Sequence, residues 1–216
     1  MPSPFHTVLF DLDGTLIDHF SAIHRSHTHT MLRLGLPAPA PARVRAAVGG
    51  GLEHALSQLV GPERVAEALP IYRAYWDATL LDDVLLLPGA RELLAALRAG
   101  GVRTAVLTNK PGDSARRICD HLGLTPLLDA VVGAKDTPWL KPDPALMRHV
   151  LAQLEADAAT ALLVGDSPYD VQAAQRAGLP AWCVTTGTHN ADELRAAGAD
   201  RVFPDLPALG RELTGD

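Results

Sequence analysis

The chain has 216 residues and a formal net charge of −6, with 47% hydrophobic and 20% charged residues. That much apolar material excludes a disordered chain and is enough for one large domain, alone or with a smaller one. The acidic balance argues against nucleic acid as a partner, because nucleic-acid-binding proteins usually carry a basic surface. No apolar run approaches the roughly 20 residues of a membrane span, so we expect a cytoplasmic protein without a membrane partner. The two cysteines, Cys119 and Cys183, are expected to be reduced.

Short apolar runs alternate with helix-like stretches over most of the chain. The runs predict buried strands at residues 7–10, 104–107, 130–132, 161–164 and 181–184. The helix-like stretches lie at residues 90–98, 114–122 and 171–177, and each is followed by glycine, a helix C-cap signal. Because strand and helix alternate, we predict an α/β fold in which helices sandwich a Rossmann-like parallel sheet.

Residues 16–86 break this alternation. They show no convincing strand, and prolines and glycines divide them into what reads as four short helices. We predict a small helical cap domain here, inserted after the first strand, with residues 1–15 and 87–216 forming the core. In open parallel sheets the ligand lies at the carboxyl ends of the strands, so the cap should cover the site.

Chemically active residues follow the predicted strands. Asp11 and Asp13 come after the first strand, Thr108 after the second and Asp166 after the fourth. Lys141, one of three lysines among 19 basic residues, lies in the loop after the third strand. The carboxyl ends of parallel strands meet at one edge of the sheet, so we expect these side chains to converge.

Converging carboxylates need a cation. Two unit charges 4 Å apart repel by about 4 kcal/mol at an effective dielectric constant near 20. An all-oxygen site with few carboxylates suits Mg²⁺, which shares its coordination shell with water and phosphate. A lysine and a threonine hydroxyl beside such an ion are suited to a second anion, such as a phosphoryl group.

Asp11 and Asp13 are suited to different tasks. They lie two residues apart at a strand end, and Gly14 allows the chain to turn sharply after them. We predict that Asp11 is a nucleophile that forms an aspartyl-phosphate, and that Asp13 is the general acid and base. These roles require environments that push the two pKa values apart.

Four motifs together resemble the haloacid dehalogenase superfamily in order and spacing. They are Asp11-Leu12-Asp13-Gly14-Thr15-Leu16, Thr108-Asn109, Lys141-Pro142 and Gly165-Asp166-Ser167-x-x-Asp170. Within the superfamily the chain looks most like phosphoglycolate phosphatases, which implies an enzyme that hydrolyses a small phosphomonoester. An Asp at the Asp13 position favours phosphoryl transfer, because true dehalogenases lack it.

The resemblance also implies a ligand set. It implies Mg²⁺ held by Asp11, the backbone carbonyl of Asp13, and Asp166, with Asp170 supporting the metal shell. Asp170 is equally suited to stabilise the start of the following helix. The resemblance further implies that Thr108 and Lys141 hold the phosphate.

Further substrate contacts are expected in loops around the site. The candidates for phosphate or substrate binding, besides Thr108 and Lys141, are Gly14, Asn109, Lys110, Gly50 and Gly51. Gly50 and Gly51 either begin a helix whose free N–H groups face the site or form a plain flexible linker. Lys110 either binds a substrate carboxylate or is a loop residue that faces the cap.

Two other functions remain open at this stage. Phosphosugar mutases of the same superfamily carry a histidine that would align with Ile23, whereas this chain has His24 one position later. His24 and His27 have the spacing of a helical metal pair, although solvated histidines are commoner. A non-enzymatic phosphoacceptor module is the remote alternative.

The expected partner is a small phosphorylated metabolite, and the chain is expected to be a monomer or a homodimer.

Overall fold

The computed structural model describes residues 4–215 and contains a six-stranded sheet with the order β5-β4-β1-β6-β7-β8. Every neighbouring pair is parallel. The strands are β1 (Thr7–Phe10), β4 (Arg103–Pro111), β5 (Ala130–Ala134), β6 (Ala161–Gly165), β7 (Ala181–Val184) and β8 (Arg201–Phe203). The predicted α/β class is therefore confirmed. The sequence analysis missed β8, a three-residue edge strand whose first residue is exposed, so it carries no buried apolar run.

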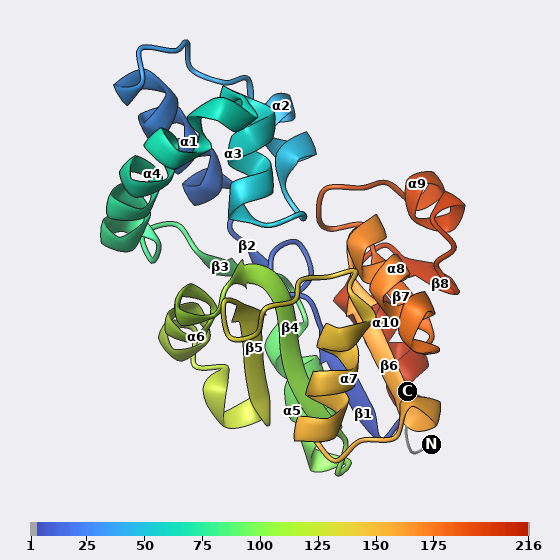
Figure 1. Ribbon diagram of the computed structural model, residues 1–216. Coiled ribbons are helices and arrows are strands. Elements are labelled where there is room, and N and C mark those ends of the chain that lie inside the picture. The colour runs from blue at the N-terminus through green and yellow to red at the C-terminus, as the bar shows by residue number, and fades with distance from the viewer. Residues whose placement is uncertain (1–3, 216) are drawn as a thin grey trace.

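Helices cover both faces of this sheet because successive strand residues point to opposite sides (Figure 1). Val8 and Phe10 of β1 belong to one hydrophobic core, and Leu9 belongs to the other. The first core includes residues of α5 (Ala90–Ala99), α6 (Gly112–His121) and α10 (Leu206–Thr214). The second includes residues of α7 (Pro144–Gln153), α8 (Pro168–Ala177) and α9 (Ala191–Ala196).

Four helices gather in a separate group beyond the carboxyl ends of the strands (Figure 1). They are α1 (Phe20–Arg33), α2 (Pro41–Ala47), α3 (Leu52–Val60) and α4 (Val65–Thr79), and we call them the cap helices. The chain enters and leaves this group through β2 (Ile17–Asp18) and β3 (Leu85–Leu86), which pair antiparallel. These two-residue strands were not predicted, because they are too short to show a pattern. The boundaries of a cap domain at residues 16 and 86 stay a prediction.

Three single-turn 3₁₀ helices complete the described elements: η1 (Pro62–Arg64), η2 (Thr125–Leu127) and η3 (Ala158–Thr160). Cys119 and Cys183 are both free and buried. Within residues 4–215, no helix combines the length and the apolar character that crossing a membrane requires.

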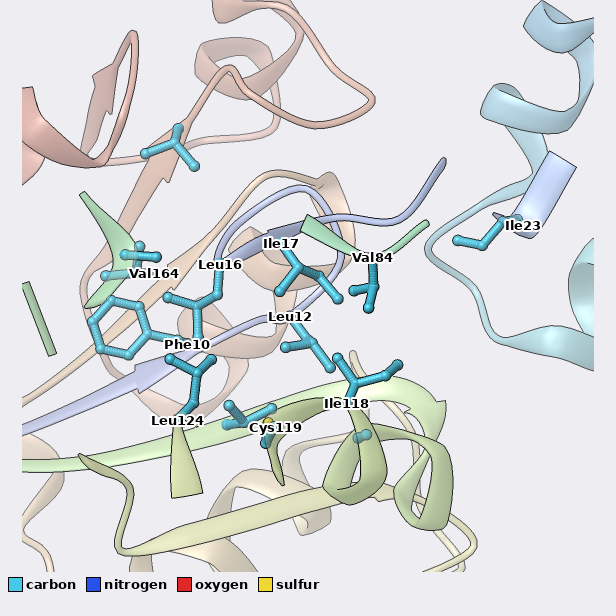
Figure 2. Close-up of a cluster of buried hydrophobic side chains, with 14 of the residues drawn as sticks. Phe10, Leu12, Leu16, Ile17, Ile23, Val84, Ile118, Cys119, Leu124 and Val164 are labelled. Carbon is cyan, nitrogen blue, oxygen red and sulfur yellow. The ribbon is translucent and has the colours of Figure 1, made fainter. Parts of the chain in front are cut away.

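A buried cluster anchors the segment that runs from β1 toward the cap helices (Figure 2). Phe10, Leu12 and Leu16 are fully buried and share one core with Ile118 of α6 and with Leu124. The carbonyl of Leu12 also accepts hydrogen bonds from the backbone N–H groups of residues 15, 16 and 17. Because Leu12 lies between Asp11 and Asp13, this packing holds both carboxylates in place.

We predict that Leu12→Ala lowers the free energy of unfolding by about 2–5 kcal/mol, because it leaves a cavity in a close-packed core. Leu32→Ala is the matched control, since Leu32 is 58% exposed on α1. Its effect should stay within about 0.5 kcal/mol. Urea unfolding followed by circular dichroism measures both changes. Equal stability of the two variants would contradict the anchoring role of Leu12.

Candidate active site

The structure brings the predicted strand-end residues together at one edge of the sheet. Asp11 directly follows β1, and Asp166 directly follows β6, its neighbour in the sheet. Thr108 lies in the last part of β4 on the other side of β1, and Lys141 comes from the loop between β5 and α7. All four side chains belong to buried residues. These four residues therefore lie where the rule for parallel sheets predicts, at the carboxyl ends of the strands.

Lys141 is the central cation of the site. Its ammonium donates hydrogen bonds to Asp11 Oδ1 at 2.7 Å and to Asp170 Oδ1 at 2.6 Å. Asn109 holds the backbone of Lys141, because its amide accepts from the N–H at 2.8 Å and donates to the carbonyl at 3.0 Å. Burial alone would lower the pKa of Lys141, but Asp11 and Asp170 raise it above its usual value, so the ammonium stays charged.

One lysine does not neutralise the carboxylates around it. Oxygen atoms of Asp11, Asp166 and Asp170 all lie within 4.8 Å of one another. Burial raises the pKa of Asp11 to about 6, with Lys141 opposing the shift and Asp170 adding to it. Burial, Asp11 and Asp170 raise the pKa of Asp166 well above its usual value. Excess negative charge in a buried all-oxygen site fits a hard divalent cation.

The Asp166 carboxylate lies in a close-fitting backbone cradle. The N–H of Thr188 donates to Asp166 Oδ2 at 3.0 Å. A Cβ on Gly187 would lie 1.8 Å from that oxygen, and a Cβ on Gly14 would lie 2.8 Å from it. Gly14 also has a φ of +84°, so glycine is required there on two grounds. Sequence analysis singled out Gly14 but missed Gly187 and Thr188, although both follow the predicted strand at 181–184.

Asp170 holds its neighbours in position through both of its oxygens. Besides the bond from Lys141, it accepts from the hydroxyl of Ser167 at 2.6 Å and from the backbone N–H groups of Ser167 and Asp166 at 3.1 and 3.3 Å. This is the capping box at the start of α8. A Cβ on Gly165 would lie 2.3 Å from Asp170 Cγ, so glycine lets the strand end approach this carboxylate.

Asp13 has a different electrostatic environment from Asp11. The ammonium of Lys110 lies 2.7 Å from Asp13 Oδ2, and Nδ1 of His19 lies 3.7 Å from Oδ1. Burial would raise the pKa of Asp13, but Lys110 and His19 hold it well below its usual value. The two pKa values are therefore far apart, with the predicted nucleophile having the higher one. Lys110, a predicted substrate contact, is paired with Asp13 and lies 4.6 Å from the centre of the Trp76 ring.

His19 is a site residue that sequence analysis did not single out. It is 2% exposed, and its Nε2 lies 2.7 Å from the carbonyl oxygen of Leu80. His19 directly follows β2, and Leu80 lies between α4 and β3. The ring therefore connects the two chain segments that lead to the cap helices, and it also faces Asp13. No signal in the sequence distinguished it from the other histidines of this region.

The glycine run of the cap contacts the core. The carbonyl of Gly49 accepts a hydrogen bond from Nδ2 of Asn109 at 2.9 Å. Gly49 and Gly51 line a cavity between the cap helices and the core, whereas a Cβ on Gly50 would meet the ring of His54 at 2.6 Å. The substrate contacts predicted for Gly50, Gly51 and Asn109 stay predictions.

A cavity of about 360 Å³ lies between the cap helices and the core, a size typical of small-molecule sites. Asp11, Asp13 and Thr108 line its core side, and Ile23 and His27 line it from α1. The expectation of a solvated His27 was wrong, because this residue is 2% exposed. The ring of His27 points from α1 into the cavity, a direction that the spacing of His24 and His27 in the sequence does not specify.

The mutase alternative depends on which residue of α1 faces this cavity. Ile23, at the position where the mutases carry histidine, lines the cavity. Nε2 of His24 lies 3.1 Å from the carbonyl oxygen of Pro39, a residue of the cap. The geometry therefore gives no support to the idea that His24 takes the place of the mutase histidine.

Comparison with known proteins establishes the family. A family model described as haloacid dehalogenase-like hydrolase matches residues 8–184, and the chain belongs to this family. The probable phosphatase IndB of Dickeya dadantii is 37% identical over 196 residues, which cover 88% of this chain and 85% of that protein. A phosphoglycolate phosphatase of Nitrosospira multiformis is 32% identical, with 95% of this chain and 94% of that protein covered.

Solved structures agree with this assignment. A predicted phosphoglycolate phosphatase from Haemophilus somnus has a TM-score of 0.90 and 25% identity, with 96% of this chain and 97% of that chain covered. The family expected from the sequence motifs is confirmed. The expected enzyme class, a phosphoric monoester hydrolase, is also confirmed, because these relatives are named as phosphatases.

The buried position of His27 predicts an acid-sensitive fold. Burial, with a smaller contribution from His24, lowers the pKa of His27 to about 4, whereas an unfolded histidine titrates near 6.5. Between these values the unfolded chain binds the proton and the folded chain does not, so acid favours unfolding. From pH 7.5 to pH 5.0 this difference should cost about 2 kcal/mol of stability.

The measurement is urea unfolding at the two pH values for the natural chain and for His27→Leu. The variant should lack this part of the acid sensitivity, since leucine does not titrate. An equal loss of stability in both proteins would contradict the prediction.

Proposed function

We propose that this protein is a Mg²⁺-dependent phosphatase that hydrolyses a small phosphomonoester through a phosphate bound covalently to Asp11. One observation carries the proposal: Asp11 lines the cavity while it accepts from Lys141 at 2.7 Å and shares a carboxylate cluster with Asp166. A nucleophile, a fixed cation and a place for a metal ion thus meet at one point. The phosphatase names of the relatives support this assignment.

Asp11 and Asp166 would hold the magnesium ion, and the family resemblance adds the backbone carbonyl of Asp13. Their raised pKa values are a physical reason for a cation between them. When bound, the ion supplies positive charge that keeps both carboxylates ionised and polarises the phosphoryl group. We assign Asp170 to support of this set, because its two oxygens already accept hydrogen bonds from Lys141, Ser167 and the backbone.

The first chemical step transfers the phosphoryl group to the protein. An oxygen of Asp11 forms a bond to phosphorus while the bond from phosphorus to the substrate oxygen breaks. Lys141 and the hydroxyl of Thr108 bind the phosphoryl oxygens, where negative charge must be stabilised. Asp13 gives a proton to the leaving oxygen, so that the product leaves as an alcohol.

The second step releases phosphate and restores the site. A water molecule attacks phosphorus, Asp13 takes the proton of that water, and the bond from phosphorus to Asp11 breaks. Because Lys110 and His19 hold the pKa of Asp13 below its usual value, the carboxylate is ionised in the free site and has an oxygen available to accept this proton. To act as the acid beforehand, Asp13 must first gain a proton, and the approach of a phosphate dianion favours this by raising its pKa.

Phosphoglycolate is the substrate that the resemblance and the names of several relatives indicate. A small phosphorylated metabolite is the proposed partner, without nucleic acid or membrane. The state of assembly, monomer or homodimer, and the cytoplasmic location stay predictions.

Asp11→Asn tests the covalent step. An amide is a poor nucleophile, so kcat for p-nitrophenyl phosphate with Mg²⁺ should fall by roughly 10³-fold or more. Asp82→Asn is the charge-matched control and should keep full activity, because Asp82 lies outside the cavity lining and its side chain is 61% exposed. Circular dichroism checks that both variants fold. Full turnover by Asp11→Asn would exclude the proposed mechanism.

With glucose 1-phosphate, the same assay addresses the mutase alternative. We expect phosphate release, whereas isomerisation without release would favour a mutase.

Gly187→Ala tests the metal site without changing a charge. The added methyl group would overlap the Asp166 carboxylate, so it should displace this oxygen ligand. We expect the Mg²⁺ concentration for half-maximal activity to rise by about 10–100-fold, as for other groups that orient metal ligands. Gly210→Ala in α10 is the control, because its Cβ would make an ordinary contact at 3.5 Å. An unchanged Mg²⁺ requirement in Gly187→Ala would contradict the assignment of Asp166.

A further inference from the structure

The cap side of the cavity is mostly apolar. If the phosphoryl group lies at Asp11, the rest of the substrate must extend toward this side. Its apolar lining residues are Ile23, Val48, Leu52, Ala55, Tyr72 and Trp76. The indole N–H of Trp76 is bound to Ser114 Oγ at 3.1 Å, so this residue offers its ring face and no free donor. An apolar body of about ring size fits such a wall better than a small polar acid does.

The lining has no buried cation free to bind a carboxylate. Among the described residues, its one unpaired basic side chain is Lys135, which is exposed at the rim. The other three are paired: Arg73 with Glu53 at 3.8 Å, Lys110 with Asp13 at 2.7 Å and Arg116 with Asp136 at 2.7 Å. A substrate carboxylate would therefore have to compete with a protein carboxylate for one of these three cations, or bind the exposed Lys135. The charge pattern therefore disfavours an acidic leaving group.

Two uncharged polar side chains, His27 and Tyr72, belong to the cap side of the cavity. His27 is 2% exposed; its Nδ1 is fully enclosed by protein, and its Nε2 makes no hydrogen bond within residues 4–215. Its ring lies 4.7 Å from that of Tyr72, whose hydroxyl likewise makes no hydrogen bond to the described residues. Both residues line the cavity. A few polar groups in an otherwise apolar pocket fix the orientation of a ligand, so His27 Nε2 and the Tyr72 hydroxyl mark a position for a polar group of the ligand.

We propose that the substrate is a phosphomonoester of an alcohol with an apolar, ring-sized body that carries one uncharged hydrogen-bonding group, and that His27 and Tyr72 bind this group. The proposal rests on the phosphatase function and names its substrate class. It disfavours phosphoglycolate, whose leaving group is small and negatively charged.

The electrostatics of His27 agree with an uncharged partner. Burial lowers the pKa of His27 to about 4, and His24 contributes in the same direction. The ring is therefore neutral at neutral pH, where it donates from one nitrogen and accepts at the other. A neutral imidazole and a phenol together recognise a hydroxyl or an amide, and they provide no net charge to hold an anion.

A panel of three kinds of substrate tests the class. It contains 2-phosphoglycolate, 2-phenylethyl phosphate, and 2-phenylethyl phosphates with a hydroxyl on ring position 3 or 4. We expect kcat/KM with Mg²⁺ to be at least about tenfold higher for 2-phenylethyl phosphate than for 2-phosphoglycolate. One of the hydroxylated compounds should gain about another tenfold, because sites built to bind a hydroxyl reject analogues that lack it.

Two variants test the residues. His27→Leu and Tyr72→Phe should each remove most of the preference for the hydroxylated compound. For 2-phenylethyl phosphate, which lacks the hydroxyl, the loss of kcat/KM in each variant should be smaller than for the hydroxylated compound, so that the ratio between the two substrates falls toward one. Tyr75→Phe is the matched control on the same helix. Tyr75 stacks on His29 at 4.1 Å, lies outside the cavity lining and should leave the preference unchanged.

The outcomes separate this inference from the proposed function. If the natural chain hydrolyses none of these compounds, nor p-nitrophenyl phosphate, the phosphatase proposal fails and the inference fails with it. If it hydrolyses them but prefers 2-phosphoglycolate, the inference alone is overturned, and loss of that preference in Lys135→Ala would identify the cation responsible. If the hydroxyl preference survives in both His27→Leu and Tyr72→Phe, the assigned residues are wrong.

Discussion

The charge balance around Asp11 is the constraint on which the rest of the site depends. Three buried carboxylates lie close together, and the single ammonium of Lys141 contacts two of them. Without that ammonium the cluster would carry unpaired buried charge, which is costly in a low-dielectric interior. Much of the surrounding structure serves to hold it: Asn109 binds the Lys141 backbone, and the capping box of α8 directs Asp170 toward the ammonium.

This balance also explains why glycines surround the site. The carboxylates approach the backbone closely enough that a methyl group on Gly165 or Gly187 would overlap them. The close approach lets backbone N–H groups of residues 166, 167 and 188 donate to carboxylate oxygens. Backbone donors are preorganised and add no net charge, so they satisfy the oxygens while leaving the site attractive to a cation.

Much of the core and its site could be predicted from the sequence, because both follow from local rules. A buried strand is a short apolar run, and in a parallel sheet the functional residues follow its carboxyl end. That reasoning located five of the strands and the positions of Asp11, Thr108 and Asp166. It missed β8, which is an edge strand. It also missed Gly187 and Thr188, because Gly187 contributes by lacking a side chain and Thr188 through its backbone N–H, so neither has the charged side chain that marks Asp11 and Asp166.

The cap could not be predicted to the same depth, because its chemistry depends on tertiary packing. Sequence indicated helices but gave no way to tell which histidine of α1 faces the cavity; the structure buries His27 there and bonds His24 to Pro39. Likewise, Lys110 lies two residues after Thr108 in β4, and from the sequence alone it could be a cation that is free to bind substrate. In the structure, the ammonium of Lys110 is paired with the carboxylate of Asp13, and this pairing also lowers the pKa of Asp13.

The two carboxylates of the predicted catalytic pair differ because they belong to different charge networks. Asp11 shares its surroundings with Asp166 and Asp170, and this network belongs entirely to the core. Asp13 faces Lys110 from the core and His19 from the chain segment that leads into the cap helices. The charge state of Asp13 thus depends directly on a residue of the segment that leads into the cap helices, whereas Asp11 is influenced by that network through Asp13. Under the proposed mechanism, the nucleophile Asp11 is therefore held by Lys141 of the core, and the acid–base group Asp13 is held from both the core and the segment that leads into the cap helices.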